Sequence, residues 1–170
     1  MGHTVSHREP HDYKDLFRVQ SKRYDPQLRE GQSLAFQLRV NPVIKKSHEN
    51  GKQRAHDVVM NAKWEMRQDG TWEDCELTEA QLAQREGERW LQRRTEHYGY
   101  NFVPDQVRVE SHRKHSFRKS SNGRRVTFTT MDFVGQLVVT DPERFREEAL
   151  FSGMGPSKAY GCGLLMVRPL

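Results

Sequence analysis

Cysteine is scarce in this sequence, and long apolar runs are missing. Only two cysteines, Cys75 and Cys162, occur among the 170 residues, and they lie far apart. Their spacing argues against a disulfide framework, favours a reducing compartment and offers no zinc-ligand pattern. No stretch approaches the roughly 18 apolar residues that span a bilayer, and residues 1–20 lack the apolar core of a secretory signal. We therefore expect a soluble, cytoplasmic protein without a cofactor.

Acidic residues are absent from one segment. Residues 111–131 contain no aspartate or glutamate, although the whole chain has 28 Lys and Arg against 23 Asp and Glu, a formal net charge of +5. The modest positive excess is therefore clustered. The cationic and histidine side chains that we single out there are Arg113, Lys114, His115, Arg118, Lys119, Arg124 and Arg125. Such a cluster favours a polyanionic partner, and we expect RNA.

Hydrophobic periodicity predicts a strand and then a helix in the first half of the chain. Apolar and polar residues alternate over 33–41, which is typical of a strand with one face on a core. We predict a charged loop over 45–54 and mostly irregular structure over 57–75. A capping-box signature at Thr78 predicts a helix over 78–97. Its expected buried side chains are Leu82, Trp90, Leu91 and Tyr98.

The second half predicts a long β-hairpin. Residues 106–117 and 124–140 are rich in β-branched residues, and an Asn-Gly pair at 122–123 favours a tight turn between two strands. Gly135 indicates a bulge in the second strand. The hairpin thus presents the acid-free cations on both sides of its turn.

A helix and a strand complete the pattern. Asp141 followed by proline predicts a helix over 141–150, and a last strand is expected over 159–167. The buried residues of this helix should be Phe145, Ala149 and Leu150. The order β, α, β, β, α, β predicts an α+β, ferredoxin-like (RRM-like) domain with a four-stranded antiparallel sheet and helices on one face.

Two motifs carry a family resemblance. They are LRVNPV at 38–43 and GPSKAYGCGLL at 155–165, and they are supported by the segments 22–46 and 126–140. Together they resemble the CasE family of CRISPR-associated endoribonucleases over about residues 15 to 170. The resemblance implies binding of a CRISPR repeat RNA hairpin and cleavage of precursor guide RNA at the base of the stem by metal-independent 2′-hydroxyl attack. It also implies that the protein stays bound as a subunit of a type I-E surveillance complex.

The same resemblance implies a domain organisation. Members of the family have two ferredoxin-like domains in tandem, with a general acid/base histidine on the first helix of the first domain. By this comparison residues 1–30 hold the last strand of a first domain plus a linker, and 31–170 form the RNA-binding second domain. No residue here takes the catalytic role by position, so the catalytic residues are unassigned. A nonenzymatic scaffold for an RNA hairpin is therefore the alternative, and a protein-interaction module with an incidental basic hairpin is a third.

Two groups of residues are candidates for RNA contact. The first is the cationic hairpin, whose side chains would contact phosphates; alternatively, its charges only discourage pairing between sheet edges. The second group is Gly155, Ser157, Lys158 and Gly161. Backbone N–H groups and the Lys158 ammonium would hold a phosphate there, or the segment is simply a tight helix-to-strand connection that needs glycine.

The histidines and tryptophans form no recognisable constellation. Histidine titrates near neutrality and suits acid/base catalysis, but each of the eight is interpreted as a surface or RNA-contacting residue. They are His3, His7, His11, His48, His56, His97, His112 and His115. A metal site at the first three is rejected because Pro10 opposes a helix there. Among the tryptophans, Trp72 is the one expected to meet a partner.

Overall fold

The fold is a four-stranded antiparallel sheet covered by helices. The computed structural model describes residues 23–47, 51, 53–118, 123 and 125–170. Within them the sheet has the strand order β4-β5-β1-β6. Its strands are β1 (Ser33–Val40), β4 (Tyr100–Arg118), β5 (Arg125–Val139) and β6 (Leu165–Pro169). This order, with helical crossovers between β1 and β4 and between β5 and β6, confirms the ferredoxin-like prediction.

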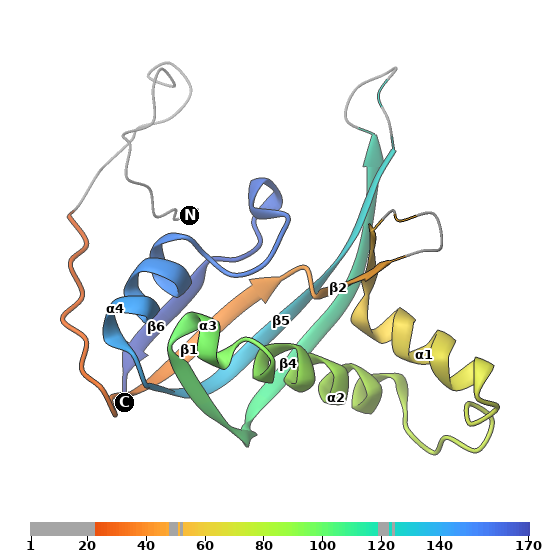
Figure 1. Cartoon of the computed structure of the whole chain (residues 1–170), viewed down its shortest axis with the longest axis horizontal. Helices are drawn as coiled ribbons and strands as arrows, with labels where there is room; N and C mark the ends of the chain where they lie inside the picture. The colour runs from red at the N-terminus through yellow and green to blue at the C-terminus, as the bar shows by residue number, and fades with distance from the viewer. Residues whose placement is uncertain (1–22, 48–50, 52, 119–122, 124) are drawn as a thin grey trace.

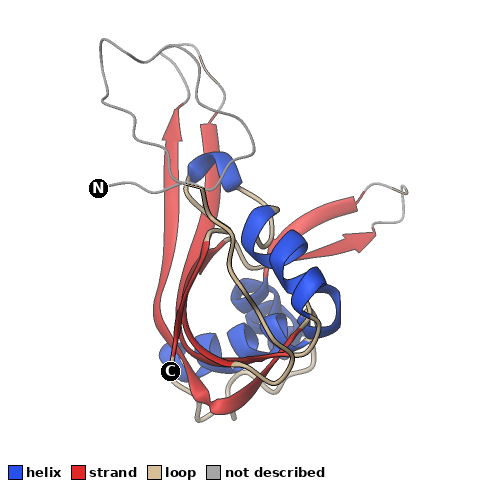
Figure 2. Ribbon diagram, turned by 90° about the vertical axis from the view of Figure 1, so that its left-hand side faces the viewer, coloured by secondary structure: helices blue, strands red, loops and turns tan. Residues whose placement is uncertain are grey.

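The helical segments lie mainly on one face of that sheet. They are α1 (Val58–Gln68), α2 (Glu79–Gln92), α3 (Thr95–Tyr98), α4 (Pro142–Arg144) and a π-helical continuation of α4 over Phe145–Phe151. A further 3₁₀ turn, Lys158–Tyr160, precedes the last strand. Figures 1 and 2 show α2, α3 and α4 against the same side of the sheet, and we call the opposite side the open face. No helix in the described ranges combines the length and apolar character that crossing a bilayer requires.

Alternation along β1 builds the core. Its even-numbered residues face the helices, and the paired residues of β5 share that face. The buried side chains contributed by these two strands are Leu34, Phe36, Leu38, Val40, Met131, Phe133, Leu137 and Val139. The helix residues expected in the core are also buried: Leu82, Trp90, Leu91, Tyr98, Phe145, Ala149 and Leu150. The amphipathic patterns therefore predicted the two-layer packing correctly.

Two predictions for the segment after β1 are wrong. The charged loop expected over 45–54 is instead a hairpin of β2 (Val43–Ser47) and β3 (Gln53–Asp57). The irregular region expected over 57–75 contains α1, which the Asp57 carboxylate caps by accepting a hydrogen bond of 2.8 Å from the Met60 N–H. Apolar residues lie on both sides of α1, since Val58 and Val59 are buried whereas Met60 is exposed. Because apolar residues occur on both sides of the helix, the sequence shows no clear 3.6-residue alternation of apolar and polar residues.

The last strand begins later than predicted. It was expected from residue 159, but β6 starts at Leu165. The preceding residues form a loop in which Gly153, Gly155, Gly161 and Gly163 all have positive φ angles. Positive φ angles are incompatible with a β-strand, so β6 begins only after the last of these glycines. We call residues 153–163 the glycine loop.

Strands β4 and β5 continue beyond the rest of the sheet. Strand β1 pairs with β5 only as far as Met131, whereas β5 residues 125–130 pair with β4 residues 113–118 alone. Figures 1 and 2 show this two-stranded ribbon rising away from the body of the molecule. We call these residues the projecting hairpin. It confirms the predicted hairpin, while its expected Asn-Gly turn falls partly outside the described residues.

A bulge near the start of β4 lies opposite Gly135. The pairing shifts between Phe102, which faces Leu137, and Val107, which faces Gly135. The extra residues therefore belong to β4 and not to the second strand of the hairpin, where the bulge was predicted, and Gly135 of β5 provides the space for them. A Cβ atom at position 135 would lie 2.3 Å from the carbonyl oxygen of Gln106. Glycine is thus required by a close backbone approach.

We predict that Gly135→Ala destabilises the fold. The added methyl group must displace backbone at Gln106, and such overpacking lowers the free energy of unfolding by about 1–3 kcal/mol. Urea unfolding of the variant and the wild type measures the change. Gln136→Ala, at the adjacent exposed position, is the control and should change stability little. Equal stability of Gly135→Ala and the wild type would contradict the close approach.

Candidate nucleic-acid interface

The projecting hairpin has two different faces. Ser111 donates a hydrogen bond of 2.7 Å to Asp132, its partner in the β-ladder, so both side chains lie on one face. Alternation puts Arg113, His115 and Phe117 on that same face. The opposite face of β4 carries a second set of side chains, namely Lys114, Ser116 and Arg118. The hairpin therefore offers positive charge in two directions.

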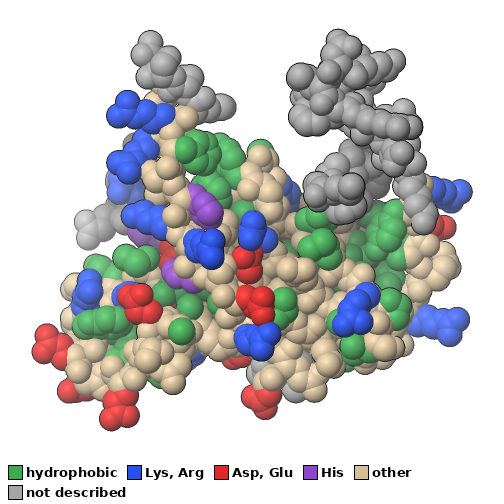
Figure 3. Space-filling view, turned by 180° about the vertical axis from the view of Figure 1, so that it is seen from behind, with side chains coloured by type: hydrophobic (Ala, Val, Ile, Leu, Met, Phe, Trp, Pro, Cys, Tyr) green, Lys and Arg blue, Asp and Glu red, His purple; other side chains and the backbone are tan. Residues whose placement is uncertain are grey.

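The described cations of the hairpin form no ion pair with any described part of the chain. Arg113, Lys114, Arg118 and Arg125 are exposed, and none forms an ion pair with another described residue. Arg125 donates only to the neutral Ser116 hydroxyl, at 2.7 Å. Figure 3 shows Lys and Arg side chains in a column along the hairpin. Arg113 also interacts electrostatically with the Asp132 carboxylate, but all four cations are exposed, so a polyanion can neutralise them.

An ion pair anchors the hairpin where it leaves the sheet. Arg39 of β1 donates two hydrogen bonds to the Asp132 carboxylate, at 2.6 and 2.8 Å, and Ser111 of β4 donates a third. The bond from Arg39 in particular holds the pKa of Asp132 below its usual range. One carboxylate thus connects three adjacent strands.

Both histidines near the hairpin make contacts within the protein. His112 Nε2 lies 3.2 Å from the Asp57 carboxylate, and His115 Nε2 lies 2.9 Å from the Thr130 hydroxyl. His97, by contrast, is exposed beside Tyr98. The candidates His3, His7, His11 and His48 lie outside the described residues, as do the predicted RNA contacts Lys119 and Arg124.

The glycine loop brings the two family motifs together. Ser157 has a φ of 66°, the only positive φ at a non-glycine residue in the described part of the chain. Its hydroxyl accepts a hydrogen bond of 2.8 Å from the side chain of Asn41, which is buried. Serine rarely adopts this conformation, so the bond helps to fix the loop. Asn41 belongs to the first motif and Ser157 to the second.

Lys158 is held back against its own loop. Its ammonium donates a hydrogen bond of 2.5 Å to the Ser152 carbonyl at the end of the π-helical segment. Its aliphatic stem also lies close to Gly153 and Gly163. These contacts favour the interpretation of the segment as a tight connection. An ammonium has three donors, however, so Lys158 retains others for a phosphate. The N–H of Gly155 donates to the Tyr98 hydroxyl at 3.2 Å, and the N–H of Gly161, an exposed residue, donates to the Lys158 carbonyl at 3.1 Å.

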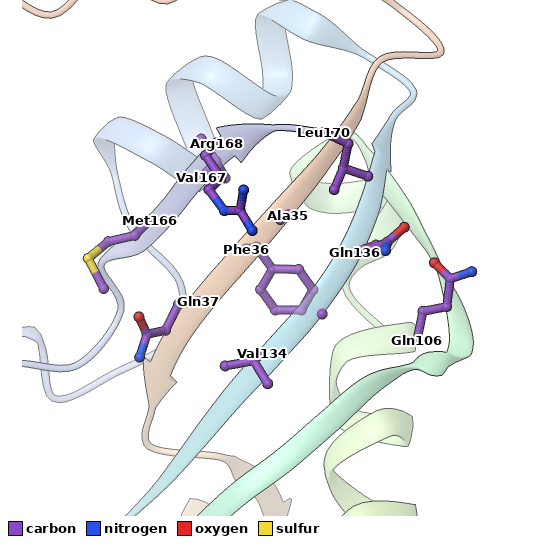
Figure 4. Close-up of a pocket in the computed structure, with 11 residues that line it drawn as sticks. Ala35, Phe36, Gln37, Gln106, Val134, Gln136, Met166, Val167, Arg168 and Leu170 are labelled. Atoms are coloured by element: carbon purple, nitrogen blue, oxygen red, sulfur yellow. The ribbon is translucent and has the colours of Figure 1, made fainter.

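The centre of the open face is a shallow hollow without an exposed ring. Figure 4 shows Phe36 between β1 and β5, but this ring is only 8% exposed. The other side chains that line the hollow include Gln37, Val134, Gln136, Met166 and Arg168. RRM-type sheets stack bases on aromatic side chains at the middle of this surface. The hairpin, rather than the sheet centre, therefore offers the better nucleic-acid site.

Sequence reasoning missed the contact made by Tyr160, whereas the expectation for Trp72 stays a prediction. Trp72, expected to meet a partner, is half-buried between Lys63 and Arg67, whose charged groups lie 5.7 and 5.3 Å from its ring. Trp64 is the exposed tryptophan of that region. Tyr160 was assigned to a strand, yet its ring packs on the hairpin. Only a contact between distant segments reveals that position.

These features define a ferredoxin-like domain with a basic projecting hairpin and a glycine loop against its base. The sequence profile of the family described as CRISPR associated protein matches residues 3–169. The chain belongs to this family.

Individual relatives agree with the resemblance. The chain is 33% identical over 150 residues to the CRISPR-associated endoribonuclease Cse3 of Thermus thermophilus, covering 87% of this chain and 61% of the relative. It is 29% identical over 152 residues to the CRISPR system Cascade subunit CasE of Escherichia coli, covering 89% and 66%. A solved structure of CRISPR endoribonuclease Cse3 bound to 19 nt RNA has a TM-score of 0.61 at 28% identity, covering 93% of this chain and 67% of that chain. The chain thus spans less than two thirds of both curated relatives.

We predict that Asp132→Asn destabilises the protein in a pH-dependent way. Loss of the charge-assisted bonds should lower the free energy of unfolding by about 1 kcal/mol at neutral pH. A lowered pKa in the folded state means that the stabilisation is complete above the unfolded-state value of about 3.9 and is lost as pH falls through the folded-state pKa. Urea unfolding of both proteins across that pH range measures it.

Asp25 provides the matched control for this experiment. Its carboxylate lies 3.8 Å from Arg23 in an exposed ion pair, so Asp25→Asn should change stability little at any pH. A destabilisation by Asp132→Asn that stayed constant into acid would show that charge is not the cause.

Proposed function

We propose that the protein binds the hairpin of a CRISPR repeat RNA through the projecting hairpin and the glycine loop. The observation that carries the proposal is the set of four exposed cations on a ribbon that extends beyond the sheet, none of which forms an ion pair with another described residue. The names of the relatives support it, since one is a CRISPR endoribonuclease and a solved relative holds a 19 nt RNA. Other subunits of a Cascade-type complex are the proposed protein partners, by similarity to the Escherichia coli subunit.

Phosphate contact is the proposed task of most of the hairpin. A two-stranded ribbon with cations on both faces can lie along an RNA stem and neutralise phosphates on each side of a groove. The interior of the RNA major groove is too narrow for side chains. At an open end of the stem, arginine can also meet guanine edges. The glycine loop would contact the backbone at the base of the stem.

For catalysis, we propose that residues 31–170 hold the RNA rather than supply the general acid and base. The family reaction implied by the resemblance is metal-independent attack of a 2′-hydroxyl on the adjacent phosphate, which leaves a 2′,3′-cyclic phosphate. Such a reaction needs a proton acceptor and a proton donor. The side chains of His112 and His115 are hydrogen-bonded within the fold. By the resemblance, the family's general acid/base histidine lies in a first ferredoxin-like domain, and no residue of 31–170 takes that role by position.

A cleavage assay separates the enzyme from the scaffold. Purified protein is incubated with its cognate repeat RNA, without added metal. A product ending in a 2′,3′-cyclic phosphate supports endoribonuclease activity of this chain. Retention of intact RNA supports the nonenzymatic scaffold. Absence of binding at low salt would contradict both functions and favour a protein-interaction module.

We predict that replacing Arg113, Lys114 and Arg118 by alanine weakens RNA binding and its salt dependence. Each lost phosphate contact should reduce the log-log slope of affinity against salt by about 0.7–0.9. Fluorescence anisotropy at several salt concentrations measures the slope. The matched control replaces Arg89, Arg93 and Arg144, three exposed arginines of the helical layer, and should keep the wild-type slope. Equal slopes for the two triple variants would rule out the hairpin as the contact.

We predict that Lys158→Met weakens RNA binding with little change in stability. Methionine retains an unbranched apolar stem against Gly153 and Gly163 but removes the ammonium. Lys158→Ala removes the stem as well and is the control for packing. Thermal unfolding and RNA affinity are measured for both variants. If Lys158→Met binds RNA normally, the lysine serves only the tight connection.

A further inference from the structure

Four aromatic rings from three separate segments form one cluster. His115 stacks on Phe128 with ring centroids 5.1 Å apart and an interplanar angle of 23°. Phe128 in turn stacks on Tyr160 of the glycine loop, at 5.2 Å and 24°. Phe128 thus stacks with two rings, and we call His115, Phe128 and Tyr160 the aromatic column. Phe117 stands edge-on to Phe128 and Tyr160, at 6.2 and 5.5 Å, and forms a wall beside the column.

His115, at one end of the column, is held by a hydrogen bond within the protein, whereas Tyr160 and the neighbouring Phe117 are exposed to solvent. His115 is bonded to the Thr130 hydroxyl, and Thr130 is only 4% exposed. At the other end, Tyr160 is 43% exposed and Phe117 is 40% exposed. Rings this exposed at the end of an ordered stack offer a free aromatic surface to a ligand.

The surroundings of the open end are cationic. Arg113 lies on the same hairpin face as Phe117, and no acidic residue occurs between positions 111 and 131. Figure 3 shows hydrophobic side chains beside the Lys and Arg column on the hairpin. Aromatic rings combined with cations that track a backbone are the usual platform for unpaired nucleotides. An apolar protein segment would leave the neighbouring charges unpaired.

We propose that Tyr160, flanked by Phe117, stacks on an unpaired nucleobase next to the stem of the bound RNA hairpin. The inference rests on the proposed function and adds the part of the RNA that this surface recognises. Bases inside a stem are covered on both faces by their neighbours, so only an unpaired or terminal base has a free face. Such a base would extend the column of His115, Phe128 and Tyr160 by one layer.

The test combines a protein change with an RNA change. Tyr160→Leu removes the ring but keeps an apolar side chain, and Tyr160→Phe keeps the ring. Each full-length protein is titrated with a blunt hairpin and with hairpins carrying one unpaired nucleotide, 2-aminopurine, on the 5′ or the 3′ side of the stem. Stacking quenches 2-aminopurine fluorescence, so it reports the contact directly.

We expect Tyr160→Leu to weaken binding of one flanked hairpin by roughly 5- to 150-fold, the effect of losing one base-aromatic stack. Binding of the blunt hairpin should weaken much less than binding of the flanked hairpin, and the salt slope should stay unchanged because no charge is lost. Quenching should be present with the wild type and Tyr160→Phe and absent with Tyr160→Leu. If Tyr160→Leu fails to fold in a thermal unfolding scan, Phe117→Leu gives the same comparison.

Two results would overturn the inference. In the first, wild-type protein binds the flanked hairpins without quenching, which assigns the exposed rings to a protein neighbour. In the second, Tyr160→Leu weakens binding of the blunt and the flanked RNA hairpins equally. The ring would then serve only to pack the glycine loop against the projecting hairpin. Both leave the proposed function intact, because RNA is still bound. If the wild type binds none of the RNAs at low salt, the proposed function itself fails.

Discussion

The candidate interface depends on the ion pair between Arg39 and Asp132. A two-stranded ribbon is marginally stable alone in water, so the projecting hairpin must be held where it leaves the sheet. At that point one carboxylate binds the guanidinium of β1 and the hydroxyl of Ser111 on β4. This side-chain connection across β1, β5 and β4 adds to their backbone pairing next to the residues at which the hairpin begins.

A second set of contacts makes the hairpin and the glycine loop one surface. Asn41 bonds Ser157, and Tyr160 packs on Phe128, so the loop is attached both to the end of β1 and to the hairpin. The two motifs that carry the family resemblance therefore meet in space, although more than a hundred residues separate them in sequence. A ligand that touches one element is placed to touch the other.

Local signals in the sequence predicted much of this arrangement. The alternation of 33–41, the capping box at Thr78 and the Asp-Pro start at 141 each depend on neighbours in sequence, and each is confirmed. Helix α1 was missed because its apolar residues lie on both sides. The proximity of Tyr160 to the hairpin depends on how β1 and β5 pair, and no local pattern contains that information. The roles of the individual RNA-contact candidates stay predictions.

The π-helical segment Phe145–Phe151 leads into the glycine loop and is wound more widely than an α-helix. The Ser152 N–H donates to the Glu147 carbonyl five residues earlier, so this turn is wider than an α-helical one. The wider turn fits the spacing of Phe145, Ala149 and Leu150, all of which face the sheet. An α-helix advances about 100° per residue. The wider turn therefore accommodates one residue more than an α-helical turn would, and it keeps three apolar side chains against the sheet before the chain enters the glycine loop.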